Sequence, residues 1–215
     1  MIVVNLEALE DPKPAVRYAA SRRLTEQGAS VVPALMDALD SAKPLLREMA
    51  AHALAGFGQG DDPSPAFPAI SKLGQLLASD SVAPVRKGAA RALGLIARAA
   101  PAAEKRIVAS ELAKGLKDSD PDARSSVAMA LAALDPSSAE AAAELGAAMQ
   151  RPEPAGSNLH QEACFRLQKM GAAAKGAVPG LVHLMKSSDP DLRASAIDAL
   201  KKLGTTVPEA KAALK

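Results

Sequence analysis

The histidines and the cysteine of this sequence are the first candidates for metal ligands or nucleophiles, namely His52, His160, His183 and Cys164. The histidines do not stand four residues apart in pairs with carboxylates beside them, as metal ligands on one helix face would. Each is expected to be a solvated histidine or part of a structural network. No phosphate-binding glycine loop and no G-x-S-x-G or H-E-x-x-H string is present. The sequence therefore predicts no catalytic residue, no metal site and no cofactor.

Cys164 is the one cysteine of the chain, which excludes an internal disulfide. Its place in the helical pattern described below is held in other copies by small or apolar residues, which predicts a structural thiol. Arg166 stands two residues further on and could lower the pKa of this thiol. The reactivity of Cys164 therefore stays open at this point.

Arginines at a fixed place in a recurring pattern are the other candidates for chemistry. The string SDPDAR at 119–124 returns as SDPDLR at 188–193. In the second copy Asp189 can cap a helix, Pro190 suits the first helical position, and Asp191 suits the first turn. A structural ladder between repeats is predicted for the marker arginines and the two cap aspartates, namely Arg17, Arg47, Arg86, Arg124, Arg193, Asp120 and Asp189. An anion-binding stripe of arginines is the alternative.

Apolar residues follow each marker arginine at helical spacing. After Arg193 they stand three, seven and ten residues on, at Ala196, Leu200 and Leu203, and Gly204 follows as a helix-ending signal. The seventh position is leucine in every copy, and a sixth copy is centred on His160. The markers lie 30, 39, 38, 36 and 33 residues apart, a range typical of helical repeats.

A second amphipathic segment follows each copy, with a proline at or shortly before its start. Every repeat is therefore expected to be a pair of helices, here called A and B. Residues 2–10 fit the B pattern and predict an N-terminal capping half-repeat. We expect a single domain over 1–215 with A/B pairs at approximately 11–40, 41–79, 80–117, 118–150, 151–186 and 187–215.

The motif D-P-D-x-[VL]-R-x-x-A-x-x-A-L-x-x-L-G resembles the HEAT-repeat family and is similar to its short variant associated with phycobilisome-lyase subunits. The resemblance rests on Asp189–Gly204, Asp120–Leu134, Pro84–Ile96, Pro44–Gly58 and Asp11–Gly28. It implies an all-α fold, a right-handed α-solenoid of about six helix pairs with an N-terminal half-repeat. It also implies an Asp/Arg ladder and a concave side lined by B helices. The candidate partner-binding face on that side comprises Asp37, Lys72, Gln75, Glu111, Lys114, Glu144 and His183.

Composition and charge agree with a water-soluble helical protein. There is no Trp, one Tyr and three Phe, so Ala, Leu, Val and Ile must pack the core. A net charge of +2 does not demand a polyanionic partner. The N-terminus lacks the features of a signal peptide, and no apolar stretch approaches a membrane span. We expect a cytoplasmic protein.

Three functions stay open. The first is a non-enzymatic scaffold that presents the concave B-helix face to a protein partner of unknown identity. The second is a bilin lyase or isomerase subunit, or a chaperone, which the repeat variant alone suggests. Deoxyhypusine hydroxylases resemble this fold and bind iron through His-Glu dipeptides, and this chain has none.

The third function is nucleic-acid binding through basic residues on the outer face of the A helices. This ridge is discontinuous, and the chain has few aromatic rings for stacking on bases. Its members are Arg22, Arg23, Lys87, Arg91, Arg166, Lys169, Lys201 and Lys202. The oligomeric state, and whether the chain is part of a longer array, are not determined by the sequence.

Overall fold

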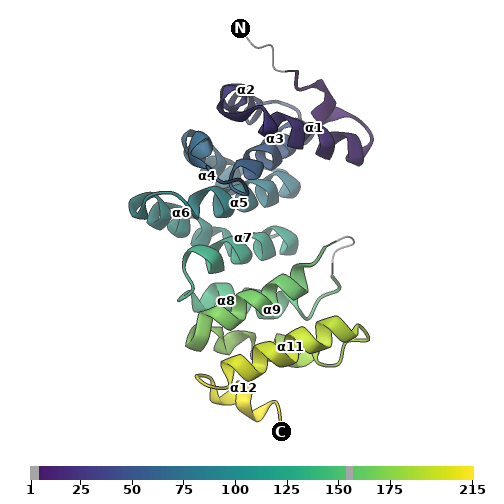
Figure 1. The fold of residues 1–215 in the computed structure, drawn as a ribbon, viewed down its shortest axis with the longest axis vertical. Coiled ribbons are helices and arrows are strands. Elements are labelled where there is room, and N and C mark those ends of the chain that lie inside the picture. The colour runs from purple at the N-terminus through teal and green to yellow at the C-terminus, as the bar shows by residue number, and fades with distance from the viewer. Residues whose placement is uncertain (1–4, 154–156) are drawn as a thin grey trace. The chain divides into compact units, whose positions relative to one another are not determined.

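The computed structural model describes residues 5–153 and 157–215, which form helices and turns and no strand (Figure 1). The A helices are α1 (Pro14–Glu26), α3 (Pro44–Phe57), α5 (Ala83–Ala97), α7 (Pro121–Leu134), α9 (Leu159–Met170) and α11 (Pro190–Leu203). The B helices are α2 (Val32–Ala38), α4 (Ile70–Ser79), α6 (Ala102–Gly115), α8 (Ala139–Ala148), α10 (Val178–Leu184) and α12 (Pro208–Ala212). The predicted all-α repeat of helix pairs is confirmed.

The chain divides into two compact units, Met1–Gly115 and Leu116–Lys215. In the first unit α3 packs against both α1 and α5, and α4 packs against α5 and α6. In the second unit α9 packs against α7 and α11, and α8 packs against α10. Within each unit, A helices therefore lie beside A helices and B helices beside B helices. The single domain over 1–215 stays a prediction.

Short 3-10 helices interrupt the α-helical pattern at four places. They are η1 (Glu7–Glu10), η2 (Gly28–Val31), η3 (Ser64–Ala69) and η4 (Gly171–Ala177). Three of them lead directly into a B helix.

The capping segment expected at 2–10 contains η1, whose Leu9 is fully buried. Residues 2–4 of this segment, and 154–156 of the expected fifth pair, lie outside the described residues. Pro12 and Pro14 follow η1 closely, and because proline has no N–H, a helix cannot propagate through them.

The aspartates of the repeated hexapeptides cap their helices as predicted. Asp120 Oδ1 accepts hydrogen bonds from the backbone N–H groups of Asp122 (3.0 Å) and Ala123 (2.8 Å). Asp189 Oδ1 makes the same two contacts at the start of α11. Both helices place proline at the first helical position, where no N–H is needed.

The leucine seven residues after each marker is buried in all six A helices and forms part of the core. These residues are Leu24, Leu54, Leu93, Leu131, Leu167 and Leu200. Alanine, valine and leucine supply most of the remaining buried surface. The periodicity in the sequence thus corresponds to the helix face that packs on its neighbours.

Two helices of the second unit approach each other more closely than a side chain allows. A Cβ added to Gly180 in α10 would lie 2.2 Å from the carbonyl oxygen of Gly146 in α8. Gly180 is required here because it lacks a side chain, and α8 and α10 pack backbone against backbone.

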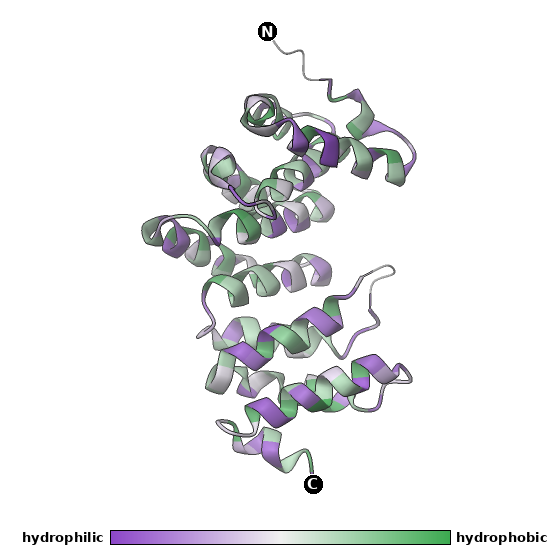
Figure 2. Ribbon diagram, in the orientation of Figure 1, coloured by the Kyte–Doolittle hydropathy of each residue, from purple (hydrophilic) through white to green (hydrophobic). Residues whose placement is uncertain are grey.

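Hydrophobic and hydrophilic residues are mixed along the helices, as Figure 2 shows by colour. Apolar positions face the neighbouring helices and polar positions face outward. Among the described residues there is no helix with the length and apolar character to cross a membrane.

Candidate protein-binding surface

All five marker arginines bind the turn that precedes their own helix. In each case Nη1 donates a hydrogen bond to the backbone carbonyl oxygen of the residue six positions earlier. The pairs are Arg17 to Asp11 (2.8 Å), Arg47 to Ser41 (2.8 Å), Arg86 to Asp80 (2.9 Å), Arg124 to Asp118 (2.7 Å) and Arg193 to Ser187 (2.7 Å). This contact is structural, since it uses a charged donor to satisfy a carbonyl that no helix ladder reaches.

The acceptor residues also shape the turn with their side chains, which sequence reasoning missed. Each is Asp or Ser, and its side-chain oxygen accepts a hydrogen bond from the N–H two residues later. The donors are the N–H groups of Lys13, Lys43, Val82, Asp120 and Asp189. The signal was present, because Asp or Ser stands six residues before each marker arginine.

Arg47 also makes an ion pair with the next repeat. Its Nε and Nη2 donate to the two carboxylate oxygens of Asp80 at 2.7 Å and 3.0 Å. The pair is sheltered, with 14% of the Arg47 side chain and 4% of the Asp80 side chain exposed. Burial alone would raise the pKa of Asp80, but hydrogen bonds from Arg47 and the Val82 N–H, with the charges of Arg47 and Arg86, lower it.

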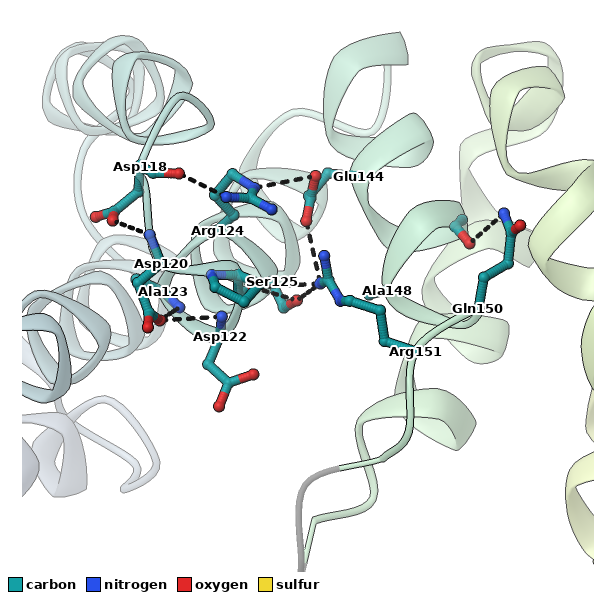
Figure 3. Close-up of polar contacts among 12 residues, drawn as sticks. Asp118, Asp120, Asp122, Ala123, Arg124, Ser125, Glu144, Ala148, Gln150 and Arg151 are labelled. Carbon is teal, nitrogen blue, oxygen red and sulfur yellow. Dashed lines mark hydrogen bonds and ion pairs between the residues drawn. The ribbon is translucent and has the colours of Figure 1, made fainter.

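In the second unit the acidic partner of the marker arginine comes from a B helix (Figure 3). Glu144 of α8 lies between Arg124 (3.5 Å) and Arg151 (3.2 Å). Arg151 also donates to the hydroxyl of Ser125 at 2.7 Å. Glu144 was predicted on the partner-binding face, and the structure shows its half-buried carboxylate engaged by two guanidinium groups of the same unit.

His160, the sixth marker, is buried at the start of α9. Its Nε2 donates to the carbonyl oxygen of Ala148 at 3.2 Å, and Glu153 accepts from its backbone N–H at 2.9 Å. Nδ1 lies 3.8 Å from the same Glu153 carboxylate. The side chain thus takes part in an internal network, one of the two roles expected for it.

Cys164 is 1% exposed, and its Sγ lies 4.0 Å from the sulfur of Met149. Burial, the main cause, and the nearby charge of Glu153 together raise the pKa of its thiol to about 12. The predicted structural thiol agrees with this environment. The net shift is therefore upward, opposite to the lowering that Arg166 could have caused.

His52 was expected to be solvated or part of a structural network, and its contacts are those of a structural network. It is half-buried between α1 and α3, where Nδ1 shares a hydrogen bond of 2.8 Å with Ser21 Oγ. The ring of Tyr18 lies 5.0 Å away at a tilt of 58°. Burial and, to a lesser extent, the charge of Arg91 lower the pKa of His52.

The predicted face in the first unit extends over three B helices. Asp37 of α2, Gln75 of α4 and Lys114 of α6 are exposed. Lys72 is partly engaged, because its Nζ contacts the Asp40 carboxylate and donates to the carbonyl oxygen of Met36 at 3.1 Å. A 2.7 Å ion pair joins Glu111 and Lys114 along α6.

In the second unit His183 of α10 is exposed, whereas Glu144 of α8 is half-buried. The structure therefore keeps His183 as a candidate for contact with a partner. Partner binding by the predicted face stays a prediction in both units.

Two aromatic residues on the outer side of A helices are exposed, and sequence reasoning did not single them out. Tyr18 of α1 is 49% exposed and Phe165 of α9 is 55% exposed. The ammonium group of Lys169 lies 4.2 Å from the centre of the Phe165 ring, a cation–π contact. On the basic ridge, Arg22 is paired with Glu26 at 3.0 Å.

Within 5–153 and 157–215, no three His, Cys, Asp or Glu side chains gather as a metal site would require.

These features define a helical-repeat scaffold whose marker residues hold turns and neighbouring repeats together. A model of the HEAT-repeat family matches residues 2–94. No curated protein matches the chain by sequence.

Solved structures show the same fold over most of the chain. An engineered protein solved by the Northeast Structural Genomics Consortium is 23% identical, with 95% of this chain and all of the other covered and a TM-score of 0.64. YibA of Escherichia coli is 16% identical (93% and 71% covered, TM-score 0.66). The complex of CpcE and CpcF of phycocyanin lyase from Nostoc sp. PCC7120 gives 22% identity (80% and 64% covered, TM-score 0.54).

Proposed function

We propose that this protein is a non-enzymatic scaffold that binds a protein partner through the exposed side chains of its B helices. The observation that carries the proposal is the row formed by Asp37, Gln75 and Lys114 on α2, α4 and α6. α4 packs against α6, and α2 contacts the segment η3 that leads into α4. The row therefore belongs to one continuous surface of the first unit.

The chemistry of this surface favours a polar protein partner. Asp37 is acidic, Gln75 is an amide and Lys114 is basic, so the row offers charges of both signs and an amide between them. Mixed charge of this kind selects partners by complementarity and orients them, while adding little affinity for each contact. No aromatic residue stands among these candidates, so we expect moderate affinity.

The bilin lyase alternative gains no support from the structural neighbours. The likeness to the phycocyanin lyase subunits is 22% in sequence and concerns the fold alone. A lyase subunit thus remains an alternative that the repeat variant suggests.

Charge reversal tests the proposed surface. The double variant Asp37→Lys/Lys114→Glu changes two exposed B-helix side chains and leaves the net charge unchanged. Glu26→Lys/Lys87→Glu, on exposed A-helix positions of the same unit, is the control with the same charge balance. Affinity capture from the native cell, with quantification of the retained proteins, should show a partner that the B-helix variant loses and the control keeps. Equal recovery by both variants would remove the B-helix assignment.

A further inference from the structure

Two of the marker arginines, Arg47 and Arg124, use two edges of the guanidinium group for two different tasks. Nη1 binds the turn before the helix in every case. The opposite edge, formed by Nε and Nη2, binds a carboxylate in Arg47, which holds Asp80 with two hydrogen bonds. In Arg124, Nε lies 3.5 Å from Glu144.

Arg17 makes the first contact and lacks the second. Its Nη1 donates to the carbonyl oxygens of Asp11 (2.8 Å) and Pro12 (3.2 Å). Its Nε is buried and has no hydrogen-bond partner among the described residues, and no other described side-chain nitrogen or oxygen is in that condition. The side-chain hydrogen bonds of Arg17 to described residues both come from Nη1, so Nη2 is also left for another acceptor. A buried donor without an acceptor costs free energy that an oxyanion would recover.

The missing acceptor follows from one residue of the sequence. Asp80 stands six residues before Arg86 and reaches back to Arg47, and the equivalent residue six before Arg47 is Ser41. Serine carries no carboxylate, and its Oγ already accepts from the Lys43 N–H.

The acidic groups near Arg17 in the sequence are engaged elsewhere. The Glu10 carboxylate pairs with Lys43 Nζ at 2.9 Å. The Asp11 carboxylate accepts from the Lys13 N–H at 2.7 Å. No ion pair joins Arg17 to a carboxylate within residues 5–153 and 157–215, so its Nε–Nη2 edge has no counterion among them.

We propose that the Nε–Nη2 edge of Arg17 is a binding site for a carboxylate from outside the folded chain. The site takes the geometry that Arg47 shows with Asp80, two parallel N–H···O contacts to one carboxylate. The carboxylate belongs to a small anion or to an acidic side chain of a bound protein, and both sources have the same chemistry. In the proposed complex Nε gains the acceptor that it lacks in the free chain, and Nη2 donates to the second carboxylate oxygen.

Thermal unfolding of the full chain in sodium acetate and in sodium chloride of equal ionic strength tests the site. Acetate should raise the Tm of the wild type by about 1–2 °C over chloride near its dissociation constant. The variant Ser41→Asp supplies the missing carboxylate, so its Tm in chloride should rise by about 2–4 °C, and acetate should add nothing specific.

The matched control is Ser187→Asp. Ser187 holds the same turn position before Arg193, but the preceding marker is His160, which is already engaged. This variant should keep the acetate increment of the wild type. The proposal is overturned if acetate raises the Tm of Ser41→Asp as much as that of the wild type, or if acetate does not raise the Tm of the wild type.

Two further arms complete the test. Arg17→Lys keeps the positive charge but cannot make two parallel hydrogen bonds to one carboxylate. Its Tm should therefore be the same in acetate as in chloride, and a rise equal to that of the wild type would also overturn the proposal. The same measurement is made with an N-acetylated, C-amidated Asp-Glu-Asp peptide. If this peptide raises the Tm at a far lower carboxylate concentration than acetate, protein side chains are the source of the carboxylate. If the peptide and acetate raise the Tm at equal carboxylate concentrations, small anions are the source.

Discussion

At the residue scale, a marker arginine ties its helix to the turn before it, because Nη1 reaches a carbonyl oxygen six residues back. The same guanidinium group then has an edge left for the next repeat, and Arg47 uses it to hold Asp80. The ladder predicted from the sequence contains the arginines as donors. Its acceptors are turn residues and, in the second unit, Glu144. Asp120 and Asp189, which were expected in the ladder, cap their own helices.

Replacing Asp80 by Asn should lower the free energy of unfolding by about 1–3 kcal/mol at pH 7, because Arg47 loses a sheltered counterion. The pKa of Asp80 is lowered in the folded state, so its contribution is present above the unfolded pKa of about 3.9 and is lost as the pH falls through the folded pKa. Urea unfolding from pH 7 to pH 3 should show the difference between variant and wild type shrink below about pH 4.

Asp37→Asn is the control for this series, since Asp37 is exposed on α2. It should change the stability by less than about 0.5 kcal/mol. A pH-independent difference between Asp80→Asn and the wild type would contradict the role of the Asp80 charge.

Cys164 should resist modification in the folded protein. Burial raises its pKa to about 12, which leaves on the order of a thousandfold less thiolate than the ordinary value of 9.0 would give. Reaction with a chromogenic disulfide reagent at pH 8 should be slow in buffer and fast in denaturing urea. Equal rates in both would show that the thiol is accessible in the native state.

Sequence patterns were more informative about donors than about acceptors. The arginines recur at one place in the helical frame, so their alignment was predictable. The acceptors lie in turns, where Ser41 and Asp80 hold the same position with different side chains. The pairing of Glu144 with Arg124 and Arg151 was not predictable, because it depends on how α7, α8 and the segment after α8 pack.

At the element scale, the A and B helices follow from apolar residues at helical spacing and from prolines at helix starts. The 3-10 helices before the B helices could not be predicted in this way, because they are too short to show a repeating pattern of apolar residues. η3 contains Pro68, whose missing N–H prevents a regular helix from running through that segment. In the second unit the contact of α8 with α10 depends on two glycines, which a pattern of apolar residues does not register.

Substituting Gly180 by Ala should destabilise the protein by about 1–3 kcal/mol, because the new Cβ would meet the backbone of α8 at 2.2 Å. Gly74 of α4 is the matched control, since a Cβ there meets nothing within 4 Å. Gly74→Ala should instead stabilise by about 0.5–1 kcal/mol, because alanine favours the helix. Chemical unfolding of both variants measures the contrast, and the same sign for both would refute the close approach of α8 and α10.

At the scale of the whole molecule, each unit presents exposed B-helix side chains to a partner, while its marker residues bind turns and neighbouring helices. In the first unit these side chains are Asp37, Gln75 and Lys114. The outer A side carries single exposed aromatic rings, Tyr18 and Phe165. A partner that binds the B helices and a partner that binds the A helices would therefore contact different residues of the chain.

Site-directed photo-crosslinking in the native cell tests the central claim most directly. A benzophenone amino acid is placed at Gln75 on the B side, or at Lys87 on the A side, both exposed positions of the first unit. The B-helix scaffold predicts a discrete crosslinked protein from Gln75 and none from Lys87. A crosslinked protein from Lys87 alone, or nucleic acid in place of protein, would contradict it.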